Sequence, residues 1–442
     1  MRQARTILAA VALLPLLFAI RLAHADDAPI VAGAEEASPG MEAPAPAHDW
    51  ALLHAGIRPR LATFGGVGTF ALAQGRVHHF YGVASFASVR QDAGVFVGAT
   101  ELSLGQANAE KFYGVAQLGL SKNLAGSFAG VTQLSLAHND AESFGGVLQL
   151  APYDRAGDFY GLAQVGGFDR TERDFVGALQ LGLAHDEADR FRGLVQVSLA
   201  HAASRDFGGG LQLAPYAHTN DFAGLVQVGV LSRDDEEFAG GLQLGLVNEV
   251  GSGSLFSHDA RDGSFAGVAQ IGALNWNDGS FAGVLQVGAG NAATHGFKGL
   301  AQIGLASATT GEMWAPVQVG ALLAYSEQFY GLAQIGTITL SDHARGAQLG
   351  VVNVSSDDHH GLQLGIVDYS GDIRGAQIGL VNVADKVRGV QIGLFNNATS
   401  LRGLQIGVVN HAEDGSLVPW STIINMGFGS DGGEAPLAAS ND

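Results

Sequence analysis

Hydrophobic and small polar positions recur along this chain with a period of about sixteen residues. Between Phe112 and Phe238 a phenylalanine opens every unit, at steps of 15 or 16 residues, in the pattern F-x-G-x-x-Q-x-G/S. Towards the C-terminus, as in the stretch 374–410, the unit shortens to R-G-x-Q-x-G-x-x-N with a period of fourteen. The period is too short for repeated helix pairs, and two glycines per unit would cost a helix about 2 kcal/mol. The pattern therefore predicts one β-strand per unit.

Alternation along each strand predicts two unlike faces. In the unit that begins at Phe265, alternation places Phe265 and Ile271 on an aliphatic face and Gln270 on an opposite, small face. The same rule puts Ile392 on the aliphatic face of a later unit. The five or six polar residues between units are expected to be turns, because they are rich in Asp, Asn, Ser and Gly.

Two all-β architectures fit this pattern. The first is a large antiparallel up-and-down β-barrel, because a tilted strand of about eleven residues matches the apolar band of an outer-membrane barrel. The phenylalanines would then form aromatic girdles, and the glutamines would line a polar lumen. The second is a β-solenoid or a shallow hairpin barrel, in which the aliphatic face is a protein core and Asn and Gln side chains stack between repeats. The uniform spacing suits the second, but the strand length favours the first, so the barrel is the main prediction and the solenoid the alternative.

Composition and local sequence divide the chain into four parts. Residues 1–25 are expected to be a signal peptide, with an apolar run before the small-residue site Ala23-His24-Ala25. Residues 26–49 read as an acidic, flexible spacer and 429–442 as a disordered tail. Residues 50–428 then form a single β-repeat domain of about 22 units. One interval, 249–264, is longer than the others and is either a functional loop or a simple insertion.

Charge and cysteine content limit the possible partners. The formal net charge is -19, which disfavours nucleic acid. The chain has no cysteine, which excludes disulfides, thiolate metal sites and a cysteine nucleophile. The expected partners are outer-membrane lipid and, at the acidic turns, a protein or a glycan. No cofactor is expected.

The C-terminal units carry a family resemblance. The segments "GLQLGIVD", "GAQIGLVN", "GVQIGLFN" and "GLQIGVVN", closed by "LVPWSTIINMGF", resemble tandem G-x-Q-x-G-x-x-N units of bacterial surface-repeat proteins of the leptospiral type. The resemblance is specific over residues 346–428 and looser over 80–340. It implies an exported or surface location, and it brings no catalytic motif.

The chemistry-bearing clusters favour structural roles. The pairs His78-His79 and His359-His360 have adjacent side chains on opposite faces of a strand, so we expect solvated turn residues rather than metal ligands. The run 234–237, Asp-Asp-Glu-Glu, lacks the spacing of a calcium loop and is expected to be a solvated acidic turn. "GSGSLF" at Gly251 is not a nucleophile elbow, and "GGVGTF" near Gly65 is not a phosphate loop. No residue is assigned to catalysis, a cofactor or a metal.

These observations lead to two functional hypotheses. The first is a non-enzymatic outer-membrane or cell-surface β-repeat protein with a structural or passive-pore role. The second is a surface-displayed β-solenoid that binds or adheres to a partner. Neither hypothesis includes an enzyme.

Overall fold

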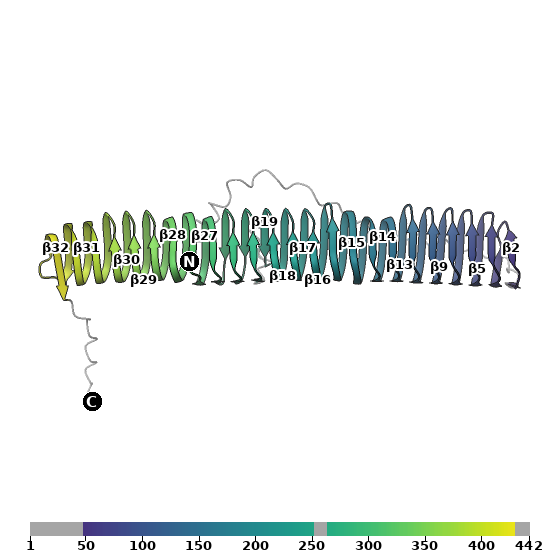
Figure 1. Cartoon of the computed structure of the whole chain (residues 1–442), viewed down its shortest axis with the longest axis horizontal. Helices are drawn as coiled ribbons and strands as arrows, with labels where there is room; N and C mark the ends of the chain where they lie inside the picture. Colours follow the sequence, from purple (N-terminus) through teal and green to yellow (C-terminus); the bar gives the residue numbers. More distant parts are fainter. Residues whose placement is uncertain (1–46, 252–262, 429–442) are drawn as a thin grey trace, which may run out of the picture. The chain divides into compact units, whose positions relative to one another are not determined.

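The computed structural model describes residues 47–251 and 263–428. From His48 onward these residues belong to one compact unit, which is a β-solenoid of about 21 turns. Its strands pair in parallel with the strands of the next coil, with the exception of the last strand, β32, which is antiparallel to β31. Successive coils lie side by side in chain order (Figure 1).

Strand bounds follow the repeat. The first coils contain β1 (Ala47–Asp49), β2 (Leu53–Gly56), β3 (Arg60–Gly65), β4 (Gly68–Ala71), β5 (Gln74–Tyr81), β6 (Ala84–Ala87), β7 (Arg90–Val97), β8 (Thr100–Ser103), β9 (Gln106–Tyr113), β10 (Ala116–Gly119), β11 (Lys122–Ala129), β12 (Thr132–Ser135) and β13 (His138–Gly145). In the next coils the short and long segments join into longer strands: β14 (Leu148–Tyr160), β15 (Ala163–Ser198), β16 (His201–Leu213), β17 (Tyr216–Val228) and β18 (Leu231–Leu244). The short strand β19 (Val247–Val250) follows them.

The second half resumes after the segment outside the described residues. It contains β20 (Ser264–Ala266), β21 (Ala269–Ile271), β22 (Leu274–Asn277), β23 (Phe281–Ala282), β24 (Leu285–Val287), β25 (Gly290–Ala293), β26 (Phe297–Lys298), β27 (Ala301–Trp314), β28 (Val317–Leu349), β29 (Val352–Leu364), β30 (Val367–Ile378), β31 (Val381–Asp414) and β32 (Trp420–Phe428).

Each coil consists of a short and a long strand segment, so the expectation of one strand per unit was wrong. In one coil the short segment is β10 and the long segment is β11. The polar intervals that were expected to be turns form the long segments: they alternate small or amide side chains inward with charged side chains outward. Because two strands per repeat return the chain to its starting side, successive repeats pair in parallel. The antiparallel barrel is therefore wrong, and the alternative, a β-solenoid, is correct.

Phenylalanine side chains form a continuous stack inside the solenoid. From Phe64 to Phe297 the ring centroids of successive coils lie 4.6–5.3 Å apart. These rings are at most 2% exposed. The column continues through Met313, Phe329, Ala344 and His359 to Ile373, Val387 and the buried Leu401. The phenylalanines that open the units are thus core residues, and they do not form the predicted aromatic girdles.

The assignment of faces from alternation was also wrong. Phe265 and Gln270 are both fully buried, whereas Ile271 points outward and is 41% exposed. The chain bends at Gly267 and Val268, between the strands β20 and β21. That bend changes the phase of the alternation, so two residues five apart both point inward. Most of the aliphatic residues consequently lie on the outside.

A ladder of glutamine amides runs through the interior. In each coil from Gln133 to Gln405 the glutamine Nε2 donates to the Oε1 of the glutamine one coil earlier, at 2.7–3.0 Å. Many also donate to a backbone carbonyl of the facing long strand, as Gln377 does to Val383 at 3.2 Å. The ladder starts at the carboxyl group of Glu101, which accepts a hydrogen bond from Gln117 Nε2 at 2.9 Å. These bonds satisfy the buried amides and join both layers of each coil.

A second ladder of shorter amides runs beside the first in the opposite direction. Asn382 Nδ2 donates to Asn396 Oδ1, and Asn396 Nδ2 donates to Asn410 Oδ1, both at 2.7 Å. The donor here precedes the acceptor in the sequence, whereas in the glutamine ladder the donor follows it. The aligned amide dipoles of the two columns therefore oppose each other. The strand β32 closes the last coil, and its Asn425 donates to Gln405 at 3.2 Å.

Glycine at positive φ accounts for the change from sixteen to fourteen residues per coil. Gly346, Gly361, Gly375, Gly389 and Gly403 have φ between 136° and 147°. The equivalent glycines of the longer coils do not have positive φ. This conformation is accessible mainly to glycine, and it closes the bend with two fewer residues.

We expect Gly389→Ala to lower the free energy of unfolding by about 2 kcal/mol or more, because it adds backbone strain and a clash. A Cβ at this position would lie 1.9 Å from the carbonyl oxygen of Gly375. The control is Gly208→Ala, whose Cβ would meet its nearest atom at 3.5 Å. Denaturant unfolding followed by circular dichroism measures both. Equal stability of the two variants would contradict the proposed role of the positive-φ bend.

Candidate functional site

The solenoid presents two outer surfaces of opposite character. One, which we call the apolar face, is formed by the outward residues of the short strand segments and the bends beside them. The other, which we call the charged face, is formed by the outward residues of the long segments. Each surface continues from coil to coil because equivalent residues lie in register.

The centre of the apolar face is a column of aliphatic and phenylalanine side chains. It consists of Phe70, Phe86, Leu102, Leu118, Leu134, Leu150, Val165, Leu181, Val197, Leu213, Val228, Leu244, Ile271, Val287, Ile303, Val319, Ile335, Leu349, Leu364, Ile378, Ile392 and Ile406. Columns of mostly aliphatic and small residues flank it, and their exposed members include Leu225 (68%), Leu332 (73%) and Val408 (61%). No charged residue interrupts these columns within the described coils.

Near the C-terminal end the apolar face is hollowed into a shallow groove of about 830 Å³. Glycines of the fourteen-residue coils, such as Gly379 and Gly393, form its floor between two aliphatic columns. Ile423 and Thr422 of β32 border the groove at its end. Ile423 has a positive φ of 73°, a conformation that is unfavourable for a β-branched residue.

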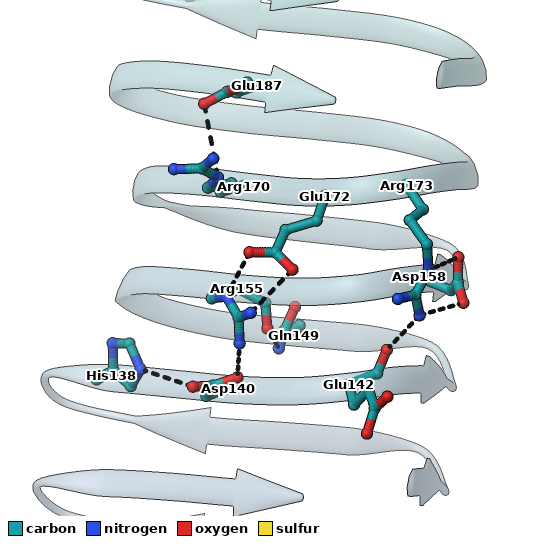
Figure 2. Close-up of polar contacts among 10 residues, drawn as sticks. All are labelled: His138, Asp140, Glu142, Gln149, Arg155, Asp158, Arg170, Glu172, Arg173 and Glu187. Carbon is teal, nitrogen blue, oxygen red and sulfur yellow. Dashed lines mark hydrogen bonds and ion pairs between the residues drawn. The ribbon is translucent and has the colours of Figure 1, made fainter. Parts of the chain in front are cut away.

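The charged face is held by ion pairs that cross from coil to coil (Figure 2). Arg155 lies between two carboxylates of neighbouring coils and approaches Asp140 and Glu172, both at 2.8 Å. Burial alone would raise the pKa of Asp140, but hydrogen bonds with His138 and Arg155, together with the charge of Arg155, hold it below its ordinary value. Like charges also stack in register on this face, since Arg155 pairs with Arg170 and Asp206 pairs with Asp221.

A second ion pair of the same face lies at the far end of the long strands. Arg173 donates to both carboxylate oxygens of Asp158, at 2.6 and 3.0 Å, and to the backbone carbonyl of Glu142 at 3.3 Å (Figure 2). Hydrogen bonding from Arg173 lowers the pKa of Asp158. The acidic groups of these coils are paired with basic ones, whereas Asp206, Asp221 and Glu237 stack in a column of like charge further along the same face.

Within the described coils, four buried carboxyl groups replace amides in the asparagine column: Asp368, between Asn353 and Asn382, and three others in a row. Asp154, Asp169 and Asp186 follow one another in successive coils at the position of Asn123 and Asn139. Asp154 accepts a hydrogen bond from Asn139 at 2.8 Å. The carboxyl groups of Asp169 and Asp186 interact with each other and with the backbone of Gly166 and Gly182, respectively. Burial, reinforced by the neighbouring carboxyls, raises the pKa of Asp169 to about 10, and burial raises that of Asp186 to about 8.

Two further acids are buried elsewhere in the interior. Glu101 carries the first acceptor of the glutamine ladder, and its pKa is raised to about 8 by burial. Asp234 accepts hydrogen bonds from Gln227 at 2.9 Å and Gln243 at 2.7 Å, and also from Thr219. Burial again raises its pKa to about 8. These acids can be protonated in the folded state near neutral pH. Protonation removes the negative charge that would otherwise be buried.

The structure separates the residue pairs that the sequence singled out. His78 and His79 are both exposed in β5, as expected of solvated residues, although they lie in a strand. His359 is fully buried in the phenylalanine column, so the expectation of a solvated turn was wrong for it. Asp234 is likewise buried within β18, and only its neighbours in the run 234–237 face outward. The turn prediction failed because the polar intervals are strands with an inward side.

The proposed loop 249–264 is described only at its ends. Glu249 and Val250 lie in β19 and Ser264 begins β20, while 252–262 fall outside the described residues. The predicted leader 1–25, most of the spacer 26–49 and the tail 429–442 also fall outside them. No group of histidine and acidic residues in the described coils is arranged to hold a metal ion. No helix in residues 47–251 and 263–428 is long and apolar enough to span a membrane.

Comparisons with known proteins leave the family open. No protein-family model, no curated protein and no solved structure matches this chain. Function must therefore be argued from the two faces and the interior alone.

The buried acids make stability depend on pH. An acid whose pKa is raised in the folded state stabilises the fold fully below its unfolded pKa of about 4, and this contribution is lost as pH rises through the folded pKa. Burial, partial for His201 and complete for His359, lowers the pKa of both histidines to about 4, so they act in the opposite sense and only below about pH 6.5. Above pH 7 the acids alone act, so stability should fall as the pH rises.

We expect the free energy of unfolding to fall between pH 7 and pH 9. Asp169→Asn should raise it at pH 9 by about 1 kcal/mol or more and flatten the pH profile, because an amide needs no proton to be buried neutral. Asp206→Asn is the control, since its side chain is 47% exposed. Denaturant unfolding at both pH values measures the effect. A wild-type stability that rises over this window would contradict the assignment.

Proposed function

We propose that this chain is a non-enzymatic protein displayed outside the cell that binds or adheres through its apolar face. The observation that carries the proposal is the uninterrupted aliphatic surface formed by the central and flanking columns. Soluble monomers rarely expose contiguous apolar patches above about 300–600 Å², and larger ones mark interaction sites. The leader-like segment 1–25 supports an exported location.

Geometry indicates how large this surface is. A coil adds about 4.8 Å along the stack, and the face spans about five residues, or roughly 16 Å, across each coil. Each coil thus contributes about 80 Å², so eight coils, with about 640 Å², already exceed the range for an ordinary monomer. A surface of this size is expected to be covered by a partner when the protein works.

The two faces favour adhesion over the passive-pore hypothesis. The solenoid interior is filled by the phenylalanine stack and the two amide ladders, so it offers no lumen for a solute. The charged face combines coil-to-coil ion pairs with stacked acidic residues such as Asp206 and Asp221, and it is well solvated in water. The apolar face is the surface whose burial would be strongly favourable, either against outer-membrane lipid or against a protein.

Adhesion of cells that display the full chain tests this proposal. Protease treatment of intact cells should remove the protein, and displaying cells should settle together or hold to polystyrene. The variant Leu300→Lys with Leu332→Lys should reduce adherent cells about tenfold, because burying an unpaired lysine is costly. Both leucines are strongly exposed, at 60% and 73%.

The control for this test is Glu110→Lys, which changes the net charge by the same amount at an exposed position outside the apolar face. It should leave adhesion unchanged. Loss of adhesion in the control and the double variant alike would show that charge matters and the apolar face does not. Resistance of the protein to protease on intact cells would exclude surface display.

A further inference from the structure

We infer that the apolar face binds the apolar face of a second copy of this chain, and that the two copies form a closed, two-fold dimer. This inference rests on the proposed role of the apolar face as a binding surface and names its occupant. It follows from the area of the face, its charge pattern and its regular spacing.

The area is sufficient for a stable dimer. A standard protein interface buries about 800 Å² on each partner. At about 80 Å² per coil, ten coils of the apolar face supply this area. The described solenoid has about 21 turns, so the face of one copy provides roughly twice what is needed.

The charge distribution permits two copies to meet on this face. The chain has a formal net charge of -19, so two copies repel each other at most surfaces. The columns of the apolar face contain no charged residue in the described coils, and the ion pairs of Asp140 and Asp158 lie on the charged face. Contact through the apolar faces buries no charge and leaves both charged faces in water. An anionic lipid surface would instead meet the full repulsion of the chain.

The spacing of side chains also matches between copies. Both faces repeat at the same coil spacing of about 4.8 Å, so the ridges of one copy can lie between those of the other over many coils. A two-fold arrangement uses the same patch on both copies and ends at two, whereas a heterologous contact would continue into a filament. If the apolar faces of the two copies overlap along their whole length, the two-fold axis passes near the middle coils. Val228 of one copy then faces Val228 of the other.

Sedimentation equilibrium of the purified full chain tests the inference. The wild type should have a mass of about twice 45.5 kDa. The variant Ile378→Lys, Ile392→Lys, Ile406→Lys should dissociate at least about 100-fold more readily, because each lysine would be buried without a partner. The control is Asp385→Lys with Thr399→Lys, which adds the same charge at exposed positions of the charged face and should remain a dimer.

Single cysteines provide a second measurement that does not depend on the folding of the triple variant. The chain contains no cysteine, so Val228→Cys and Asn220→Cys each introduce a unique thiol. Mild oxidation should link copies through Val228→Cys and leave Asn220→Cys, on the charged face of the same coil, largely unlinked. Equal linking at both positions would overturn the inference.

Vesicles of neutral phosphatidylcholine separate this inference from the proposed function. A monomeric wild type that sediments with the vesicles, and loses this binding in the triple lysine variant, would overturn the dimer but keep the apolar face as the binding surface. A monomer that neither sediments with vesicles nor supports adhesion would overturn both. A dimer that the triple variant separates supports the inference.

Discussion

The constraint on which this structure depends is that the buried glutamine amides, one in each coil from Gln117 to Gln405, need hydrogen-bond partners inside the packed solenoid. A glutamine amide offers two donors and one oxygen acceptor, and the coil-to-coil ladder uses both kinds of group. Each Nε2 reaches the preceding glutamine, and many also reach a facing carbonyl, as in Gln405, which donates to Gln391 at 2.8 Å and to the carbonyl of His411 at 3.0 Å. A shift of one residue between coils would leave these amides unpaired at a cost of about 1–3 kcal/mol each. The ladder therefore fixes the register of the whole stack.

The same constraint explains the second glycine of the repeat. In the last coils the side chain of Asn396 reaches the bend of the next coil, where its Nδ2 donates to the carbonyl of Ile406 at 3.0 Å. A Cβ at Gly407 would lie 2.5 Å from that Nδ2 atom. Where the asparagine column contains Ala202 or Ala217, the matching glycine positions are occupied by Ser198 and Ala214. Glycine is thus present mainly where an amide needs the space.

Much of the fold followed from the period of the repeat, and the errors followed from one assumption. The all-β class, the tandem repeat and the stacking of amides between coils were available from the positions of Phe, Gln and Asn. Unbroken alternation was the assumption that failed, since it placed Ile271 beside Phe265. The five-residue interval from Phe265 to Gln270 was the signal of a bend, because two inward side chains on one straight strand must be an even number of residues apart. The buried Asp169 and His359 were hidden for the same reason, since the polar intervals were taken as turns. The exposure of the apolar face could be recognised only after the bend had reversed the two sides.

One short repeat thus combines three roles: amides and phenylalanines hold the coils together, ion pairs keep one surface in water, and aliphatic residues form the surface proposed to meet a partner. The glutamine ladder is tested most directly by hydrogen exchange of the side-chain amides in protein labelled with ¹⁵N only at glutamine. We expect slow exchange for the ladder glutamines, comparable to backbone amides in the core strands, and fast exchange for Gln74, Gln106 and Gln328, which are partly exposed. Fast exchange of all glutamine side chains in the folded protein would contradict it.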